Sequence, residues 1–264
     1  MCIRDSNRPA SALVVPGAGL FNASGGVSTA VRSSSPIIVI SGEHEDRIND
    51  TARSHWIEPL TKWSARTSSP SDVAARVPEA VHAACSGHPR PVYLEVPSSV
   101  LSQEEEVEIA PPISIHPTSG DAETLERAAR MLSEAKRPLI LAGTGVHRSG
   151  ASTTLKKLAE KLPAAVVTTT AGKGCISDRN PLALGNALRA YKPLVAFAQS
   201  CDVILSIGTS NGPVSLLDVD PSCVIRVDLD PDALTADQAL AIKADAHFCS
   251  RDSHRDSTTR QSRK

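Results

Sequence analysis

The sequence of 264 residues lacks an excess of charge of either sign. Its 28 Lys and Arg residues nearly balance its 29 Asp and Glu residues, so the formal net charge is −1. Proteins that bind nucleic acid or anionic membranes usually carry an excess of basic residues on one face. The composition therefore argues against both kinds of partner.

Paired cysteines and long apolar runs are missing as well. The six cysteines form no C-x-x-C pair and stand far apart: Cys2, Cys85, Cys175, Cys201, Cys223 and Cys249. This pattern argues against a disulfide framework or a zinc site, and it fits a reducing cytoplasm. No apolar run approaches the roughly 20 residues of a membrane-spanning helix, and the amino terminus has no apolar signal region. We therefore expect a soluble, cytoplasmic chain whose cysteines are small buried hydrophobes.

The sequence does contain apolar runs that alternate with segments of helical spacing. In the first half, the runs at 11–15, 36–42 and 91–97 are largely continuous rather than alternating. Such runs are typical of strands that are buried on both faces of a parallel sheet. Segments at 19–33 and 72–86 have the small or periodic apolar residues of helices and separate the expected strands.

The second half repeats this pattern after an acidic, proline-rich segment. Thr118 or Ser119 is expected to cap its first helix, and Pro138 forces that helix to end. The expected strands of this half lie at 139–142, 165–170, 203–207 and 224–229. Successive strand and helix units of this kind build open parallel sheets with right-handed crossovers. The predicted fold class is α/β, with two consecutive doubly wound parallel-sheet domains.

The composition also divides the chain into five parts. They are a non-native leader over 1–8, a first α/β domain over 9–100, a linker over 101–120, a second, Rossmann-like domain over 121–248 and a disordered or frame-shifted tail over 249–264. The leader begins with MCIRDS, which resembles the translated end of a sequencing adapter; a short disordered terminus is the alternative. The tail has no aliphatic residue from position 250 onward, so it cannot contribute to a core.

Glycine-containing turns suggest phosphate binding. PGAGLFN at 16–22 follows an expected strand, but Asn22 stands where a dinucleotide fingerprint needs its third glycine. AGTG occurs at 142–145, and AGKG at 171–174 is not a Walker loop because Gly174 replaces the Ser or Thr that ligates magnesium. Alternatively, these glycines serve only tight turns between strands and helices.

A set of ordered stretches resembles the family of thiamine-diphosphate-dependent decarboxylases and acetolactate synthases. The set comprises PGAGLFNASGGVSTAVRSSSPIIVISGE, PLTKWSAR, PRPVYLEVPSSVL, KRPLILAGTGVHRSGA, VVTTTAGKGCISDRNPLALGN, DVILSIGTS and VIRVDLDP. The resemblance covers nearly everything from residue 9 to residue 246. It implies the end of the family's pyrimidine-binding domain followed by its central domain, and it replaces the dinucleotide interpretation of the first turn.

The resemblance also implies roles for residues of the first domain. Gly17, Gly19 and Asn22 would lie beside the pyrimidine ring of thiamine diphosphate at a subunit interface. Glu43 stands where acetolactate synthases place a glutamine that faces the substrate. A carboxylate there would disfavour an anionic 2-keto acid unless it is protonated or paired. Lys62 matches a lysine near the substrate channel, and a solvated surface lysine is the alternative.

Residues of the second domain correspond to the flavin site of some family members. In those members the turns that match Gly143 and Gly145, and the acids that match Asp228 and Asp230, face FAD. The segment GTSNG at 208–212 lacks the charged residues that FAD-binding relatives show, so the sequence disfavours FAD. Some members bind another adenine nucleotide or nothing. We expect the two aspartates to act mainly as strand-end and helix-cap residues.

The chemistry that the resemblance implies is decarboxylation of a 2-keto acid or its joining to a second carbonyl compound. The resemblance implies thiamine diphosphate and Mg²⁺ as cofactors and a homodimer or homotetramer as the assembly. The run EHED at 43–46 is not expected to bind a metal, since adjacent loop residues rarely converge on one ion.

Two indispensable parts of the family's machinery are not found in these residues. The catalytic glutamate would precede the first expected strand, and the G-D-G…N segment that holds magnesium and the diphosphate would follow residue 246. We therefore expect a fragment that is inactive by itself. The alternatives are a nucleotide-binding Rossmann-like protein and a non-catalytic interaction subunit.

Overall fold

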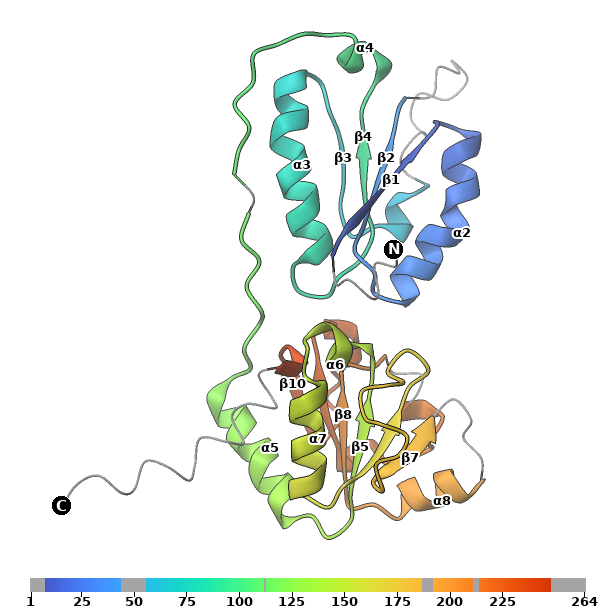
Figure 1. The fold of residues 1–264 in the computed structure, drawn as a ribbon, viewed down its shortest axis with the longest axis vertical. Coiled ribbons are helices and arrows are strands. Elements are labelled where there is room, and N and C mark those ends of the chain that lie inside the picture. The colour runs from blue at the N-terminus through green and yellow to red at the C-terminus, as the bar shows by residue number, and fades with distance from the viewer. Residues whose placement is uncertain (1–7, 44–55, 112, 187–191, 211–213, 248–264) are drawn as a thin grey trace, which may run out of the picture. The chain divides into compact units, whose positions relative to one another are not determined.

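The computed structural model describes residues 8–43, 56–111, 113–186, 192–210 and 214–247. Two compact units make up the chain, Met1–His116 and Pro117–Lys264. The boundary between them falls inside the segment 101–120 that the sequence indicates as a linker. Each unit is an α/β structure around a parallel sheet, as predicted (Figure 1).

The first unit has a four-stranded sheet in the order β1-β2-β4-β3, and its paired strands are all parallel. Its elements, in the part of the unit that the structure describes, are β1 (Ala10–Val14), α2 (Ala18–Arg32), β2 (Ile37–Ser41), a 3-10 helix (Glu58–Leu60), β3 (Ser64–Arg66), α3 (Pro70–Cys85), β4 (Val92–Glu95) and α4 (Ser98–Leu101). Val39 faces the cluster that contains α2, whereas Ile38 faces the cluster that contains α3. The alternation of side chains along β2 therefore buries both faces of the sheet.

The second unit has a six-stranded parallel sheet in the order β10-β9-β8-β5-β6-β7. Its helices within the described residues are α5 (Ala122–Glu134), α6 (Thr144–Arg148), α7 (Ser152–Lys161), α8 (Lys192–Gln199) and the 3-10 helices Pro221–Cys223 and Pro231–Ala233. Its strands are β5 (Pro138–Ala142), β6 (Ala165–Thr168), β7 (Ala183–Asn186), β8 (Val203–Ile207), β9 (Val224–Asp228) and β10 (Leu240–Lys243).

Both faces of this second sheet are covered. Ile140 of β5 packs in the cluster that includes α5, α6 and α7, which lie along one side of the sheet in Figure 1. The neighbouring Leu139 and Leu141 pack in the other cluster, with Leu194 of α8 and with Leu217. Each residue of β5 is buried, which explains why a continuous apolar run identified it.

Some local predictions were wrong, and each has a physical reason. Strand β1 is an edge strand whose residues alternate in burial, and Leu13 is 81% exposed, so it is not buried on both faces. Helix α5 is capped by Asp121, whose carboxylate accepts from Thr124 N at 2.9 Å, and not by Thr118 or Ser119. The strands β3, β7 and β10 have only three or four residues and were not predicted.

Candidate functional site

The carboxyl end of the first sheet carries the glycine turn. Strand β1 ends at Val14, and Gly17, with φ of 68°, precedes helix α2. A side chain at Gly19 would lie 2.5 Å from Cγ2 of Val15, so the turn packs tightly there. Asn22 is exposed on α2 at the same edge of the sheet. The three residues expected beside the pyrimidine ring therefore lie between the end of β1 and the second turn of α2.

Glu43 follows β2 at this same edge and is held in a charge network. Its Oε1 lies 2.8 Å from Nη2 of Arg66, which ends β3. The Nη1 atom of Arg66 lies 3.2 Å from Oε1 of Glu95, a carboxylate that is only 3% exposed at the end of β4. The hydroxyl of Tyr93 donates to the other oxygen of Glu95 at 3.3 Å, and burial followed by the charge of Glu95 raises the pKa of Tyr93.

This network was not predicted from the sequence, because Glu43, Arg66 and Glu95 are distant in the chain. The sequence did hold one clue to this network. Glu43 follows β2, and Arg66 and Glu95 end β3 and β4, and parallel strands bring their carboxyl ends to one edge of a sheet. The structure shows that Glu43 is paired. A charged partner is one of the two conditions under which a carboxylate there tolerates an anionic substrate.

Lys62 lies at the opposite end of the first sheet. It precedes β3, and its backbone N–H donates to the carbonyl of Pro91 at 2.8 Å, just before β4 begins. Its Nζ donates to the carbonyls of Ser86 and His88 at 2.5 and 3.1 Å, where the chain leaves α3. Burial and then the charge of Arg90 lower the pKa of Lys62. Within one copy of this unit, Lys62 and Glu43 are therefore not brought together.

The glycine turns of the second unit meet at the carboxyl end of its sheet. Gly143 follows β5 and Gly208 follows β8, and these strands are neighbours where the strand order reverses. Gly145 N–H donates to the carbonyl of Gly208 at 3.0 Å. A side chain at Gly143 would lie 2.0 Å from the oxygen of Gly208, so only glycine fits there.

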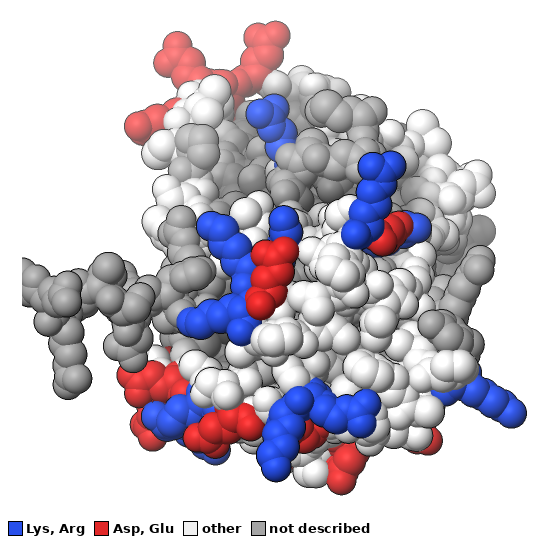
Figure 2. All heavy atoms as spheres, turned by 60° about the horizontal axis from the view of Figure 1, so that its bottom comes forward, with Lys and Arg blue, Asp and Glu red and all other residues white. Residues whose placement is uncertain are grey.

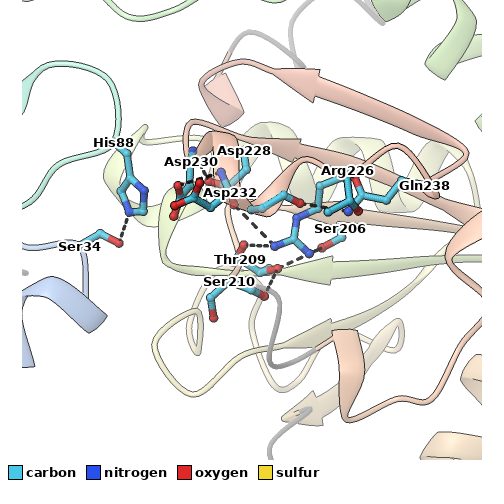
Figure 3. A network of polar contacts seen from close by, with 12 residues as sticks. Ser34, His88, Ser206, Thr209, Ser210, Arg226, Asp228, Asp230, Asp232 and Gln238 are labelled. Carbon is cyan, nitrogen blue, oxygen red and sulfur yellow. Dashed lines mark hydrogen bonds and ion pairs between the residues drawn. The ribbon is translucent and has the colours of Figure 1, made fainter.

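Asp228 ends β9 beside a buried arginine, as Figure 3 shows. Its Oδ2 lies 3.9 Å from Nη2 of Arg226, and its Oδ1 accepts from Asp230 N at 3.0 Å. Burial raises the pKa of Asp228 and lowers that of Arg226. Asp230 in turn caps the 3-10 helix at Pro231–Ala233 by accepting from Asp232 N at 3.2 Å.

Other candidate groups can be placed as well. The described cysteines are free thiols, and burial raises the pKa of Cys175 to about 12 and that of Cys201 to about 11, as for inert hydrophobic residues. The rest of the EHED run, the leader up to residue 7 and the tail from residue 248 lie outside the described residues.

Neither a metal cluster nor a membrane helix emerges from the part of the chain that the structure describes. No group of three or more His, Cys, Asp or Glu side chains converges within these residues. None of their helices is both long and apolar enough to cross a bilayer. On the face in Figure 2, Lys and Arg side chains are interspersed with Asp and Glu side chains beside uncharged surface.

Comparison with known proteins gives family matches in both units. Residues 125–250 match the model of the thiamine pyrophosphate enzyme central domain, and residues 1–63 match that of the N-terminal thiamine pyrophosphate binding domain. A relative named "Probable acetolactate synthase large subunit" from Methanocaldococcus jannaschii is 31% identical over 233 residues, which are 81% of this chain and 39% of the relative. Human 2-hydroxyacyl-CoA lyase 1 is 30% identical over 77% of this chain and 38% of the lyase.

The fold is also found in solved structures. The crystal structure of benzoylformate decarboxylase from Polynucleobacter necessarius matches with a TM-score of 0.79 at 22% identity. The match covers 94% of this chain and 49% of the decarboxylase chain. This chain therefore spans about half or less of the length of the proteins that it resembles.

Proposed function

We propose a function from the premise that the chain belongs to the thiamine pyrophosphate enzyme family. The proposal is that its two units form part of an enzyme that uses thiamine diphosphate to act on a 2-keto acid. The observation that carries it is the shared edge of the first sheet, where the glycine turn at Gly17 and the paired carboxylate of Glu43 lie together. Ligands of open parallel sheets bind at such edges.

The residues at this edge fit one side of the cofactor. When bound, thiamine diphosphate supplies the electron sink that lets a 2-keto acid lose CO₂ or transfer its acyl group. Gly17 and Gly19 would admit its pyrimidine ring close to the backbone, and the exposed amide of Asn22 would hydrogen-bond nearby. Arg66 would offset the charge of Glu43 and so reduce its repulsion of the substrate carboxylate.

The choice between carboligation and simple decarboxylation is left open in this proposal. Relatives of this chain are named as a synthase, a lyase and a decarboxylase. The substrate class proposed is a 2-keto acid, and the assembly proposed for the whole enzyme is a homodimer or homotetramer.

We further propose that these 264 residues do not catalyse the reaction alone. The chain spans 39% of the Methanocaldococcus relative, and no G-D-G run occurs in the sequence. Mg²⁺ would then be held by residues outside those described, which contain no converging set of metal ligands. FAD is not part of the proposal.

The role of the glycine turn can be tested with a matched pair of variants in the enzyme read from the complete gene. Gly19→Ala places a methyl group 2.5 Å from Val15 in the turn, whereas Gly25→Ala places one in open space on the same helix. We expect Gly19→Ala to raise the thiamine diphosphate concentration that gives half-maximal activity by about tenfold, which corresponds to a loss of about 1.4 kcal/mol of binding free energy. Gly25→Ala should leave it unchanged. If both variants need the same thiamine diphosphate concentration for half-maximal activity, the glycine turn is not part of the cofactor site.

A further inference from the structure

The second unit has the strand order at which open α/β sheets bind ligands. In open α/β sheets, ligands bind beyond the carboxyl ends of the strands, where the strand order reverses. Here that place lies at the ends of β5 and β8, next to β9. We propose that Arg226 is a built-in substitute for a ligand at this place, and that the unit binds neither FAD nor another dinucleotide there.

Arg226 is the first line of evidence, because its side chain is fully enclosed. It has 0% exposure in the middle of β9, between the apolar Ile225 and Val227. Its Nη1 donates to Oγ of Ser206 at 3.1 Å, and its Nη2 donates to the carbonyl of Thr209. A buried guanidinium is tolerated only when such acceptors and a carboxylate surround it. A ligand that took these acceptors would leave buried N–H donors of Arg226 without hydrogen-bond partners.

The same contacts tie down the segment that follows β8. Ser206 lies directly opposite Arg226 in the pairing of β8 with β9. The hydroxyls of Ser206 and Thr209 are 3.0 Å apart, and the Thr209 hydroxyl donates to the carbonyl of Ser210 at 3.1 Å. Figure 3 shows these groups converging on the guanidinium of Arg226. The arginine therefore holds the start of this segment against β9.

The glycine turns are the second line of evidence. A dinucleotide site uses free backbone N–H groups of such turns to hold the pyrophosphate. Here Gly143 N–H donates to the carbonyl of Ile207 at 3.0 Å, and Gly145 N–H donates to the carbonyl of Gly208 at 3.0 Å. The N–H of Gly208 itself donates to the carbonyl of Val227 at 2.9 Å. These three donors are already used within the protein.

Charge gives the third line of evidence. The carboxylate of Asp228 pairs with Arg226 across 3.9 Å, so the cation is balanced internally. Asp230 follows two residues later and is held by its own capping contact to Asp232 N. A diphosphate at this edge would meet two carboxylates and a cation that is already paired, which disfavours its binding.

The first test is a titration of the 264-residue chain with FAD, followed by flavin fluorescence, and with ADP and NAD⁺ by calorimetry. We expect no saturable binding of any of the three at concentrations up to about 100 μM, well above the affinity of a dedicated cofactor site. Saturable binding of any of the three would overturn the proposal. This test uses the unaltered chain, and its result does not depend on whether the proposed thiamine diphosphate enzyme is active.

The second test asks whether a small cation replaces the arginine. Arg226→Ala should lower Tm, and about 20 mM guanidinium chloride should raise the Tm of this variant by about 3 °C, by binding to the folded state. The same salt should not raise the Tm of the unaltered chain, and sodium chloride should raise neither. If Arg226→Ala folds only when guanidinium is present, this result supports the proposal as well as a rise in Tm would. A variant that guanidinium neither stabilises nor helps to fold would contradict it.

Discussion

At the scale of single residues, Arg66 balances the charge at the carboxyl end of the first sheet. It lies between Glu43 and Glu95, and its own side chain is half exposed while that of Glu95 is 4% exposed. The two carboxylates therefore share one guanidinium. The removal of Arg66 would leave the buried carboxylate of Glu95 without its cation. An uncompensated buried charge of this kind destabilises the folded state.

Arg66→Ala is therefore expected to lower the free energy of unfolding by about 2 kcal/mol. The additional change Glu95→Gln should recover part of this loss, because a neutral amide needs no cation. Arg76→Ala is the matched control, since Arg76 on α3 pairs with the more exposed Asp72 and Glu79 and should contribute little. Urea unfolding at neutral pH is measured for Arg66→Ala, Glu95→Gln, the double variant and Arg76→Ala. Additive losses in the double variant would show that Arg66 and Glu95 do not interact.

At the scale of elements, helix α5 depends on a cap that the sequence assigned to the wrong residue. Asp121 accepts from the backbone N–H of Thr124 at 2.9 Å and from its hydroxyl at 2.7 Å. The Thr124 hydroxyl and then its N–H lower the pKa of Asp121. The sequence favoured Thr118 or Ser119 as the cap, and only the path of the chain decides which side chain reaches the first backbone N–H groups of the helix.

Asp121→Ala is expected to lower Tm by about 3 °C at pH 7, whereas Ser119→Ala should change it little. Since the pKa of Asp121 is lowered in the folded state, its stabilising effect is present above the ordinary aspartate pKa of about 3.9 and is lost as pH falls through the lower folded value. The difference between Asp121→Ala and the unaltered chain should therefore shrink below about pH 4. A difference in Tm that stayed constant down to pH 2 would rule out the ionised cap.

Helix α3 contains a second element-scale feature, a proline in its interior. Pro78 has no N–H to donate to the carbonyl four residues earlier, whereas Pro70 occupies the first turn, where that donor is not needed. We expect Pro78→Ala to raise the free energy of unfolding by about 1–2 kcal/mol. Pro70→Ala should give no gain. Destabilisation by Pro78→Ala in denaturant unfolding would mean that α3 needs the proline's bend to seat Ala80 and Ala84 on the sheet.

At the scale of the whole molecule, the sequence predicted the α/β class because most strands are buried on both faces. Strands such as β5 and β8 are buried along their full length and so appear as apolar runs. The short β10 alternates between buried and exposed residues, and the short β7 has no buried residue, so neither leaves such a run. The edge position of β1 could not be predicted, because strand order depends on contacts between distant segments.

The candidate sites were predictable to a different degree. The glycine turns were visible in the sequence, and the resemblance to a family gave them a meaning. The contacts of Arg66 and Arg226 were not visible, since each arginine meets partners from other strands and carries no motif of its own. Lys62 shows the converse case, in which a recognisable residue caps the end of α3 at the amino edge of the sheet.

The central claim is that this chain is part of an enzyme that acts on 2-keto acids with thiamine diphosphate. The most direct measurement is CO₂ release from a panel of 2-keto acids by the protein expressed from the complete gene, with and without added thiamine diphosphate and Mg²⁺. The account predicts release that requires the cofactor, and none from the 264-residue chain under the same conditions. Cofactor-dependent release by the chain alone, or none by the complete protein with any 2-keto acid, would contradict it.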